Sequence, residues 1–267
     1  MKLPFSGTAD YISTPELNQA VSCALALGRP LLVKGEPGTG KTVLARAIAQ
    51  ALGRPLHKWH IKSTSQAQDG LYTYDVVARL NDSRFGGGDV HNIRHYIRTG
   101  PLGTALSLDE ESVVLVDEID KADPEFPNDL LRELDEMAFT IAELDETVTA
   151  KKRPLVIITS NAEKELPDAF LRRCVFHFLE FPNADRMQEI VRVHHPELDA
   201  SLVDAAMKRF FELRHRRGLR KRPSTSELVD WLAVLAHHGA SPDLVAAGLP
   251  YAGTLLKDES DLSAFVN

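Results

Sequence analysis

In the first two thirds of the chain, short continuous apolar runs alternate with segments whose apolar residues have the spacing of a helix. Runs at 31–33, 113–116 and 155–158 are each shorter than an ordinary helix. Such runs are typical of strands that are covered on both faces of a parallel sheet. A Gly-Arg-Pro break precedes a further strand at 56–61, and 175–181 has the pattern of a fifth. The pattern predicts the α/β class, with a parallel sheet between helices.

Helical spacing fills the intervals between these runs. Thr14-Pro15-Glu16 has the form of a cap residue followed by a first-turn proline, and it begins a mostly apolar helix that ends at Gly28. Behind the first strand, Leu44, Ile48 and Leu52 have the spacing of one helical face. A further helix is expected from Asn128 to Met137.

Two segments depart from this alternation. Residues 63–106 have a weak pattern with a triple glycine, and we expect an insertion with local structure, including a short helix at 91–97. A disordered spacer stays open as the alternative, because glycine and polar flanks fit that composition too. Residues 139–151 alternate and predict a β-hairpin that turns at 144–146.

The composition changes after Pro182. Residues 184–267 have no convincing strand pattern, so we expect an α/β core domain over 1–183 and a small helical domain over 184–267. Helices of this second domain are expected to begin near Asp185, Asp199, Thr225 and Pro242.

The loop after the first strand has the sequence GEPGTGKT, which fits the phosphate-loop pattern G-x-x-x-x-G-K-[ST]. Its backbone N–H groups and the following helix N-terminus are expected to surround a phosphate with partial positive charge. Lys41 is expected to reach the β- and γ-phosphates, and the Thr42 hydroxyl to bind Mg²⁺. The predicted nucleotide-binding residues are Gly35, Glu36, Pro37, Gly38, Thr39, Gly40, Lys41, Thr42 and Val43.

Polar residues follow two buried strands at the edge where open α/β sheets bind ligands. Asp117 ends the strand at 113–116 and is expected to hold the Mg²⁺. Glu118 is expected to polarise the attacking water as a general base. Asn161, after the strand at 155–158, is a candidate sensor of the γ-phosphate or the water.

A short helical segment ends in two arginines, Arg172 and Arg173. In a single subunit these would be surface charges. In a ring, one of them could reach the γ-phosphate of a neighbouring subunit, an effect worth ~10³ to 10⁵ in rate in other enzymes.

Charge and cysteine content narrow the choice of partners and compartment. The net charge of −7 argues against nucleic acid as a partner of the whole chain. The basic run at 214–222 is the exception, and we expect a solvated loop there. Cys23 and Cys174 lie in apolar contexts and predict buried, reduced thiols. No apolar run is long enough to span a membrane, so we expect a cytoplasmic protein.

GEPGTGKT, VVLVDEIDKAD, VIITSN and LPDAFLRR, in this order and spacing, resemble the AAA+ P-loop NTPases and within them the MoxR group. The resemblance covers essentially the whole chain and implies a sheet of order 5-1-4-3-2 with a C-terminal helical lid. It makes Arg173 the expected arginine finger, with Arg172 beside it. The segment 224–227 departs from the family pattern, because it has no second-sensor arginine; Arg220 and Arg222 are the alternative candidates for that role.

The same resemblance implies an Mg²⁺-dependent ATPase that forms a homo-oligomer, a hexameric ring. Relatives of this kind are chaperone-like remodellers that work with a von Willebrand factor A domain protein, often to mature a metalloenzyme client or insert its cofactor. Within the MoxR group, this chain resembles the short members that are linked with carbon monoxide dehydrogenase maturation.

Two other functions stay open at this point. The basic run favours a DNA-directed motor or loader, and a slow hydrolysis rate would suit a nucleotide-gated binding module. The chain has no N-K-x-D sequence, the motif that recognises guanine in GTPases, so ATP is the expected nucleotide. Tyr11 and Ile12 are candidate contacts to the adenine base.

Overall fold

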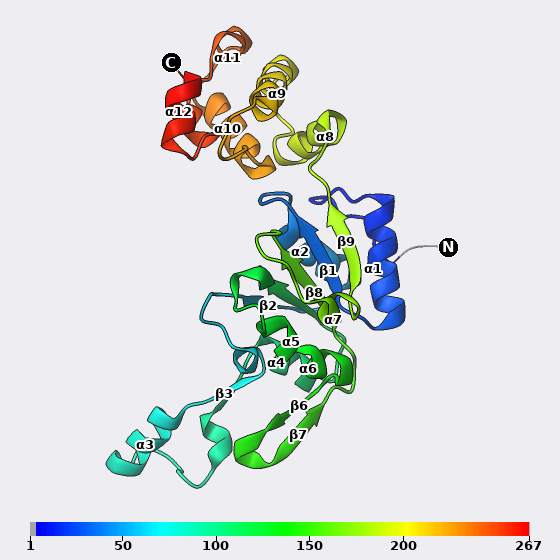
Figure 1. The fold of residues 1–267 in the computed structure, drawn as a ribbon, viewed down its shortest axis with the longest axis vertical. Helices are drawn as coiled ribbons and strands as arrows, with labels where there is room; N and C mark the ends of the chain where they lie inside the picture. Colours follow the sequence, from blue (N-terminus) through cyan, green and yellow to red (C-terminus); the bar gives the residue numbers. More distant parts are fainter. Residues whose placement is uncertain (1–3, 267) are drawn as a thin grey trace. The chain divides into compact units, whose positions relative to one another are not determined.

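The structure is a computed structural model, and it describes the backbone of residues 4–266 and the side chains of residues 4–264. Its centre is a five-stranded sheet with the order β2-β5-β8-β1-β9 (Figure 1). Numbered along the chain as the first to fifth strand of this sheet, the order is 5-1-4-3-2, so the predicted topology is confirmed. The strands are β1 (Leu31–Gly35), β2 (Leu56–His60), β5 (Val113–Asp117), β8 (Leu155–Ser160) and β9 (Val175–Leu179).

The three central strands explain the continuous apolar runs. The pairs β1–β8, β5–β8 and β2–β5 are parallel, with Leu115 opposite Ile157 in the middle of the sheet. Every residue of β5 and β8 is buried. A strand that is covered on both faces needs apolar side chains at consecutive positions, because neither face meets water.

The helices beside the sheet begin and end at identifiable residues. In α1 (Pro15–Leu27), the Leu17 N–H donates to the Thr14 hydroxyl at 3.1 Å, and Gly28 ends the helix with a left-handed φ of 60°. Both predicted ends are therefore confirmed. The other helices of this part are α2 (Lys41–Leu52), α4 (Pro101–Ser107), α5 (Phe126–Asp129), α6 (Leu131–Glu136) and α7 (Asp168–Leu171). The helix expected over 128–137 is wrong in its extent, because α5 and α6 are separate elements.

The segment expected to form an insertion has regular local structure. It contains the 3-10 turns η1 (Ala67–Gly70) and η2 (Ile93–Tyr96), the antiparallel strands β3 (Tyr72–Tyr74) and β4 (Ile97–Thr99), and the helix α3 (Val76–Phe85). A structureless spacer is thereby contradicted. The helix expected at 91–97 is only the turn η2, and α3 buries no residue.

A hairpin follows α6. Its strands β6 (Ala138–Ile141) and β7 (Glu146–Thr149) pair antiparallel, and the turn η4 (Ala142–Leu144) joins them. The backbone N–H of Ala142 donates to the Tyr72 hydroxyl of β3 at 3.0 Å. The β3–β4 ribbon and the hairpin therefore contact each other directly.

The C-terminal region is helical, as predicted. It contains α8 (Ala184–His194), α9 (Ala200–His215), α10 (Thr225–His237), α11 (Pro242–Ala247), η5 (Ala252–Thr254) and α12 (Glu259–Val266). The first four begin within one residue of the predicted starts, because a polar side chain caps each N-terminus. These caps are Asn183, Asp199, Ser224 and Ser241.

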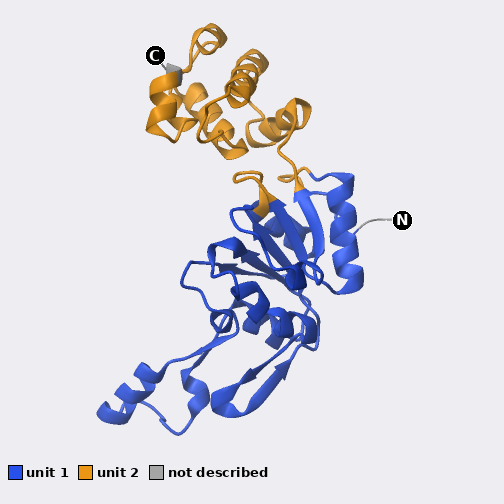
Figure 2. Cartoon of the chain, viewed as in Figure 1, with its two compact units in different colours: residues 1–7, 13–34, 42–178 blue, residues 8–12, 35–41, 179–267 orange. Residues whose placement is uncertain are grey.

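The chain divides into two compact units, each with its own hydrophobic core (Figure 2). Unit 1 consists of 1–7, 13–34 and 42–178, and its core joins the sheet to α4, α5 and α6. Unit 2 consists of 8–12, 35–41 and 179–267, and its core surrounds Phe210 and Trp231. None of the helices within residues 4–266 is long and apolar enough to cross a membrane.

The two cysteines differ in exposure. Both are free thiols, but Cys23 is exposed, so the prediction that both are buried is wrong for this residue. Burial raises the pKa of the Cys174 thiol to about 12. At pH 8 almost no Cys174 is therefore in the reactive thiolate form.

We expect iodoacetamide at pH 8 to alkylate Cys23 at least about a hundredfold faster than Cys174, because the thiolate is the nucleophile. Mass spectrometry of peptides from the labelled native protein measures both rates. Urea should bring the two rates together, since unfolding removes the desolvation of Cys174. Similar rates in the native protein would contradict this description of the two sites.

Candidate functional site

Hydroxyl groups hold the carboxylate of Asp117 at the end of β5. The Thr159 hydroxyl donates to Asp117 Oδ1 at 2.7 Å, and the Thr42 hydroxyl lies 3.0 and 3.2 Å from the two carboxylate oxygens. The Nδ1 atom of His60, the last residue of β2, lies 3.2 Å from Asp117 Oδ2. Asp117 is 6% exposed. Its position is thus fixed from three neighbouring elements.

Glu118 has an uncommon backbone conformation. Its φ is 60°, in the left-handed region that few residues other than glycine adopt. Its backbone N–H donates to the Thr159 hydroxyl oxygen at 2.8 Å. Because the same hydroxyl donates to Asp117, Thr159 positions both acidic residues. A strained residue that its surroundings hold in place is typical of functional sites.

The Glu118 carboxylate lies between an amide and an ammonium group. Asn161 Nδ2 donates to Glu118 Oε1 at 3.0 Å, and Lys121 forms an ion pair with Oε2. The Asn161 backbone N–H donates to Asp120 Oδ2 at 3.0 Å, which anchors the turn after β8. The structure therefore brings together Thr42, Asp117, Glu118 and Asn161, all of which the sequence analysis selected.

The two arginines after α7 differ in their contacts. Arg173 Nε lies 2.6 Å from Asp135 Oδ2, and Arg173 Nη1 donates to the Ala169 carbonyl at 2.9 Å. The Arg172 side chain is exposed and has no hydrogen bond or ion pair with the residues whose side chains the structure describes. Neither guanidinium contacts the acidic pair of its own chain.

The predicted phosphate loop belongs to unit 2, except for Thr42 and Val43, which lie in unit 1. Lys41 is buried, and its Nζ donates to the carbonyls of Gly35 and Glu36, each at 2.8 Å. The Thr39 hydroxyl donates to the same Glu36 carbonyl at 2.8 Å. Gly38 and Gly40 have φ values of 73° and 90°, a conformation that glycine adopts at little cost.

The candidate base-contacting residues lie beside this loop. A Cβ atom at Gly40 would lie 3.6 Å from Tyr11 Cε2, so the ring is next to the loop. The Ile12 carbonyl accepts a hydrogen bond from Arg186 at 2.9 Å. Burial raises the pKa of Tyr11 to about 12, an effect that the positive charge of Arg186 reduces. Tyr11 is therefore a neutral side chain at physiological pH.

The residues fit a magnesium nucleotide. A hydroxyl and a carboxylate within 3.2 Å of each other are oxygen ligands of the kind Mg²⁺ takes, with water and substrate phosphate completing its octahedron. The described residues contain no group of three or more His, Cys, Asp or Glu side chains that could hold a metal ion by themselves. The helix α2, which begins at Lys41, adds a positive N-terminal dipole to the loop.

Sequence reasoning missed several residues that shape this site. Thr159 and His60 are at strand ends beside β5, and their position in the predicted sheet could have suggested them. Lys121 lies three residues after Glu118, a spacing at which side chains on a helical turn meet. Arg214 lacks such a local signal. It is buried rather than part of a solvated basic loop, which corrects the prediction for 214–222 at this residue.

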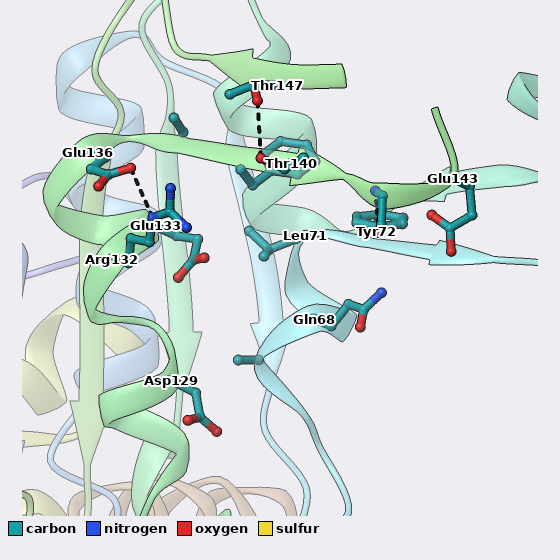
Figure 3. A pocket seen from close by; sticks show the side chains of 14 residues that line it. Gln68, Leu71, Tyr72, Asp129, Arg132, Glu133, Glu136, Thr140, Glu143 and Thr147 are labelled. Atoms are coloured by element: carbon teal, nitrogen blue, oxygen red, sulfur yellow. Dashed lines mark hydrogen bonds and ion pairs between the residues drawn. The ribbon is translucent and has the colours of Figure 1, made fainter. Parts of the chain in front are cut away.

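A separate cavity of about 540 Å³ lies in unit 1 (Figure 3). Residues of η1 and β3 form one wall, and residues of α5, α6 and the hairpin form the others. Figure 3 shows Tyr72 on one side and Asp129, Glu133 and Glu136 along the opposite helices. The Tyr72 and Phe139 rings stack with centroids 6.2 Å apart. The cavity thus lies where the ribbon meets the hairpin.

Comparisons with known proteins agree with this fold. Chaperone protein ClpB 1 of Nostoc sp. is 29% identical over 195 residues, which are 68% of this chain and 19% of that protein. Gas vesicle ATPase GvpN of Haloferax mediterranei is 27% identical over 208 residues, 72% of this chain and 58% of GvpN. The chain therefore spans less than two thirds of the length of each relative.

Among solved structures, the RuvB Holliday junction branch migration motor of Thermotoga maritima superposes with a TM-score of 0.52 at 18% identity. The match covers 87% of this chain and 65% of that chain. This likeness shows a shared fold. The family model described as AAA domain (dynein-related subfamily) matches residues 30–174, more than half of the chain. The chain belongs to this family of AAA+ proteins.

Proposed function

We propose that this chain is an Mg²⁺-dependent ATPase of the AAA+ type that converts ATP to ADP and phosphate. The proposal rests on hydrogen bonds that link Thr42 to Asp117, Asp117 to Thr159, and Thr159 to Glu118. These bonds place the expected metal ligands, Thr42 and Asp117, and the second carboxylate at one sheet edge. Membership of the AAA family supports it.

Each residue has a separate task in this proposal. Bound ATP supplies the phosphoanhydride bond, and Mg²⁺ neutralises charge on its phosphates. The loop from Gly35 to Val43 binds the triphosphate, while Thr42 and Asp117 hold the metal. Glu118 accepts a proton from the attacking water, and Asn161 orients that carboxylate and senses the phosphate. Lys41 withdraws charge from the β- and γ-phosphates, as its position in the motif implies.

The chain is proposed to work as a homo-oligomer, a hexameric ring. Arg173, with Arg172 beside it, stabilises charge on a neighbouring subunit's γ-phosphate. Both arginines are exposed, and the Arg173–Asp135 pair is of the surface kind that contributes little, about 0 to 1 kcal/mol. Breaking this pair to make a phosphate contact would therefore cost little free energy.

The proposed action is remodelling of a protein client by movement of the β3–β4 ribbon and the hairpin against that client. The Tyr72–Ala142 hydrogen bond and the cavity beside it support coupling of the ribbon to the hairpin, because a shift of one element must change the other. The resemblance to the MoxR group extends the proposal to a von Willebrand factor A domain partner and to maturation of a metalloenzyme client. A cytoplasmic location belongs to the same proposal.

ATP turnover per subunit is expected to rise steeply with protein concentration and then reach a plateau, since a site shared between subunits is incomplete in a monomer. Phosphate release and light scattering across the same dilution series measure activity and assembly together. A monomer that hydrolyses ATP at the full rate would contradict the shared site. Stimulation by duplex DNA that weakens steeply with salt would favour the DNA-directed alternative.

A further inference from the structure

Arg214, in the last turn of α9, is buried in unit 2 and has three partners. It is 8% exposed, and its Nη1 donates to the Pro223 carbonyl at 2.7 Å. Its guanidinium carbon lies 3.4 Å from the centroid of the Phe181 ring. The Nη2 atom donates to the carboxylate of Glu36. Burial of a cation is costly unless it is paired, so this arrangement is specific rather than a solvated charge.

Glu36 connects this arginine to the phosphate loop. It is the second residue of the loop, and its backbone carbonyl accepts hydrogen bonds from Lys41 Nζ and the Thr39 hydroxyl. Its carboxylate is turned to the helical region and accepts from Arg214. A single residue therefore links the internal contacts of the loop to the end of α9.

The loop also packs on the start of α10. A Cβ atom at Gly38 would lie 2.3 Å from Ser224 Cβ, so no side chain fits at this position. Ser224 caps α10 and follows Pro223, whose carbonyl holds Arg214. The loop is thus supported at two points by one corner of the helical region, residues 223–224 and Arg214.

We infer that Arg214 is a positioning residue of the phosphate loop. It neutralises the Glu36 carboxylate, which would otherwise repel the phosphates of ATP, and it ties the loop to the corner at 223–224. The inference rests on the proposed function, since it assigns a residue for nucleotide binding at the same site. An arginine is required, because a planar guanidinium can stack on Phe181 and donate to two separate acceptors.

A double-mutant cycle tests this assignment with a fluorescent, non-hydrolysable ATP analogue. Arg214→Met is expected to raise the Kd of the analogue about tenfold to a hundredfold, because it leaves the Glu36 charge unpaired. Glu36→Gln in that background should restore part of the affinity, so that the double variant binds the analogue more tightly than Arg214→Met does. Arg214→Lys should not restore it. Arg217→Met, at an exposed arginine of the same run, is the matched control and should bind as the wild type does.

Independent losses in the two single variants, with no restoration in the double variant, would overturn the inference in favour of a direct contact between Arg214 and nucleotide. An unchanged Kd in Arg214→Met would overturn it as well. Should that variant fail to fold, Glu36→Lys decides the question: repulsion by Arg214 should weaken binding, and unchanged or tighter binding overturns the inference. Failure of the wild type and of Arg217→Met to bind the analogue would instead contradict the proposed ATPase.

Discussion

Glu118→Gln is expected to lower the rate of ATP hydrolysis by about 10² to 10⁴, the range that general-base catalysis contributes. ATP affinity should stay within about threefold of the wild type, because Thr42, Asp117 and the phosphate loop are unchanged. Glutamine has nearly the shape of glutamate and can still accept the hydrogen bond from Asn161. The substitution therefore removes the proton acceptor and leaves most of the local packing.

Phosphate release under saturating ATP measures the rate, and isothermal titration measures the affinity. Glu165→Gln removes an exposed carboxylate from the loop after β8 and should leave both quantities unchanged. Hydrolysis at the wild-type rate in Glu118→Gln would remove the general-base assignment. A large loss of affinity would show that Glu118 supports binding rather than the chemical step.

Arg173→Ala is expected to reduce hydrolysis by about 10³ to 10⁵, the range measured for arginines that act on a neighbour's phosphate in other enzymes. The reason is electrostatic, since the guanidinium offsets charge that develops on the phosphoryl oxygens. Arg172→Ala should have a much smaller effect, although Arg172 is exposed. Assembly should be retained, which sedimentation of the variant can verify.

Asp135→Asn provides the control for Arg173. It removes the ion-pair partner of Arg173 within its own chain while the arginine stays in place. Hydrolysis by this variant should be equal to or higher than that of the wild type, because the arginine is released for the neighbour. If Arg172→Ala were inactive and Arg173→Ala active, the two roles would be exchanged. Full activity in both alanine variants would exclude a trans arginine from this segment.

Local patterns were sufficient to predict the sheet and the helix starts. The strands follow from short apolar runs, whereas their order in the sheet was implied by the resemblance to the AAA+ proteins. Caps such as Thr14 and Ser224 bond to atoms within their own turn. The acidic pair and Asn161 could be chosen because strand ends of a parallel sheet meet at one edge. Contacts between neighbouring strands then follow from the topology.

Features that depend on distant contacts could not be predicted in this way. The apolar pattern at 126–136 does not reveal the boundary at Leu130 between α5 and α6. The helix α3 buries no residue, and three of its apolar residues, Val76, Val77 and Leu80, are exposed and lie in its first half, so the pattern there is too short to indicate a helix. Arg214 is 178 residues from Glu36, and its neighbours in sequence are basic, so composition indicated a solvated loop.

Mixing two inactive variants tests the central claim most directly. Glu118→Gln subunits lack the general base, and Arg173→Ala subunits lack the trans arginine. A ring that contains both has some interfaces with an intact Glu118 on one side and an intact Arg173 on the other. Random equimolar mixing should make about a quarter of the interfaces complete and restore about a quarter of the wild-type rate. If phosphate release by the mixture stayed at the level of the separate variants while mixed rings formed, the shared catalytic site would be contradicted.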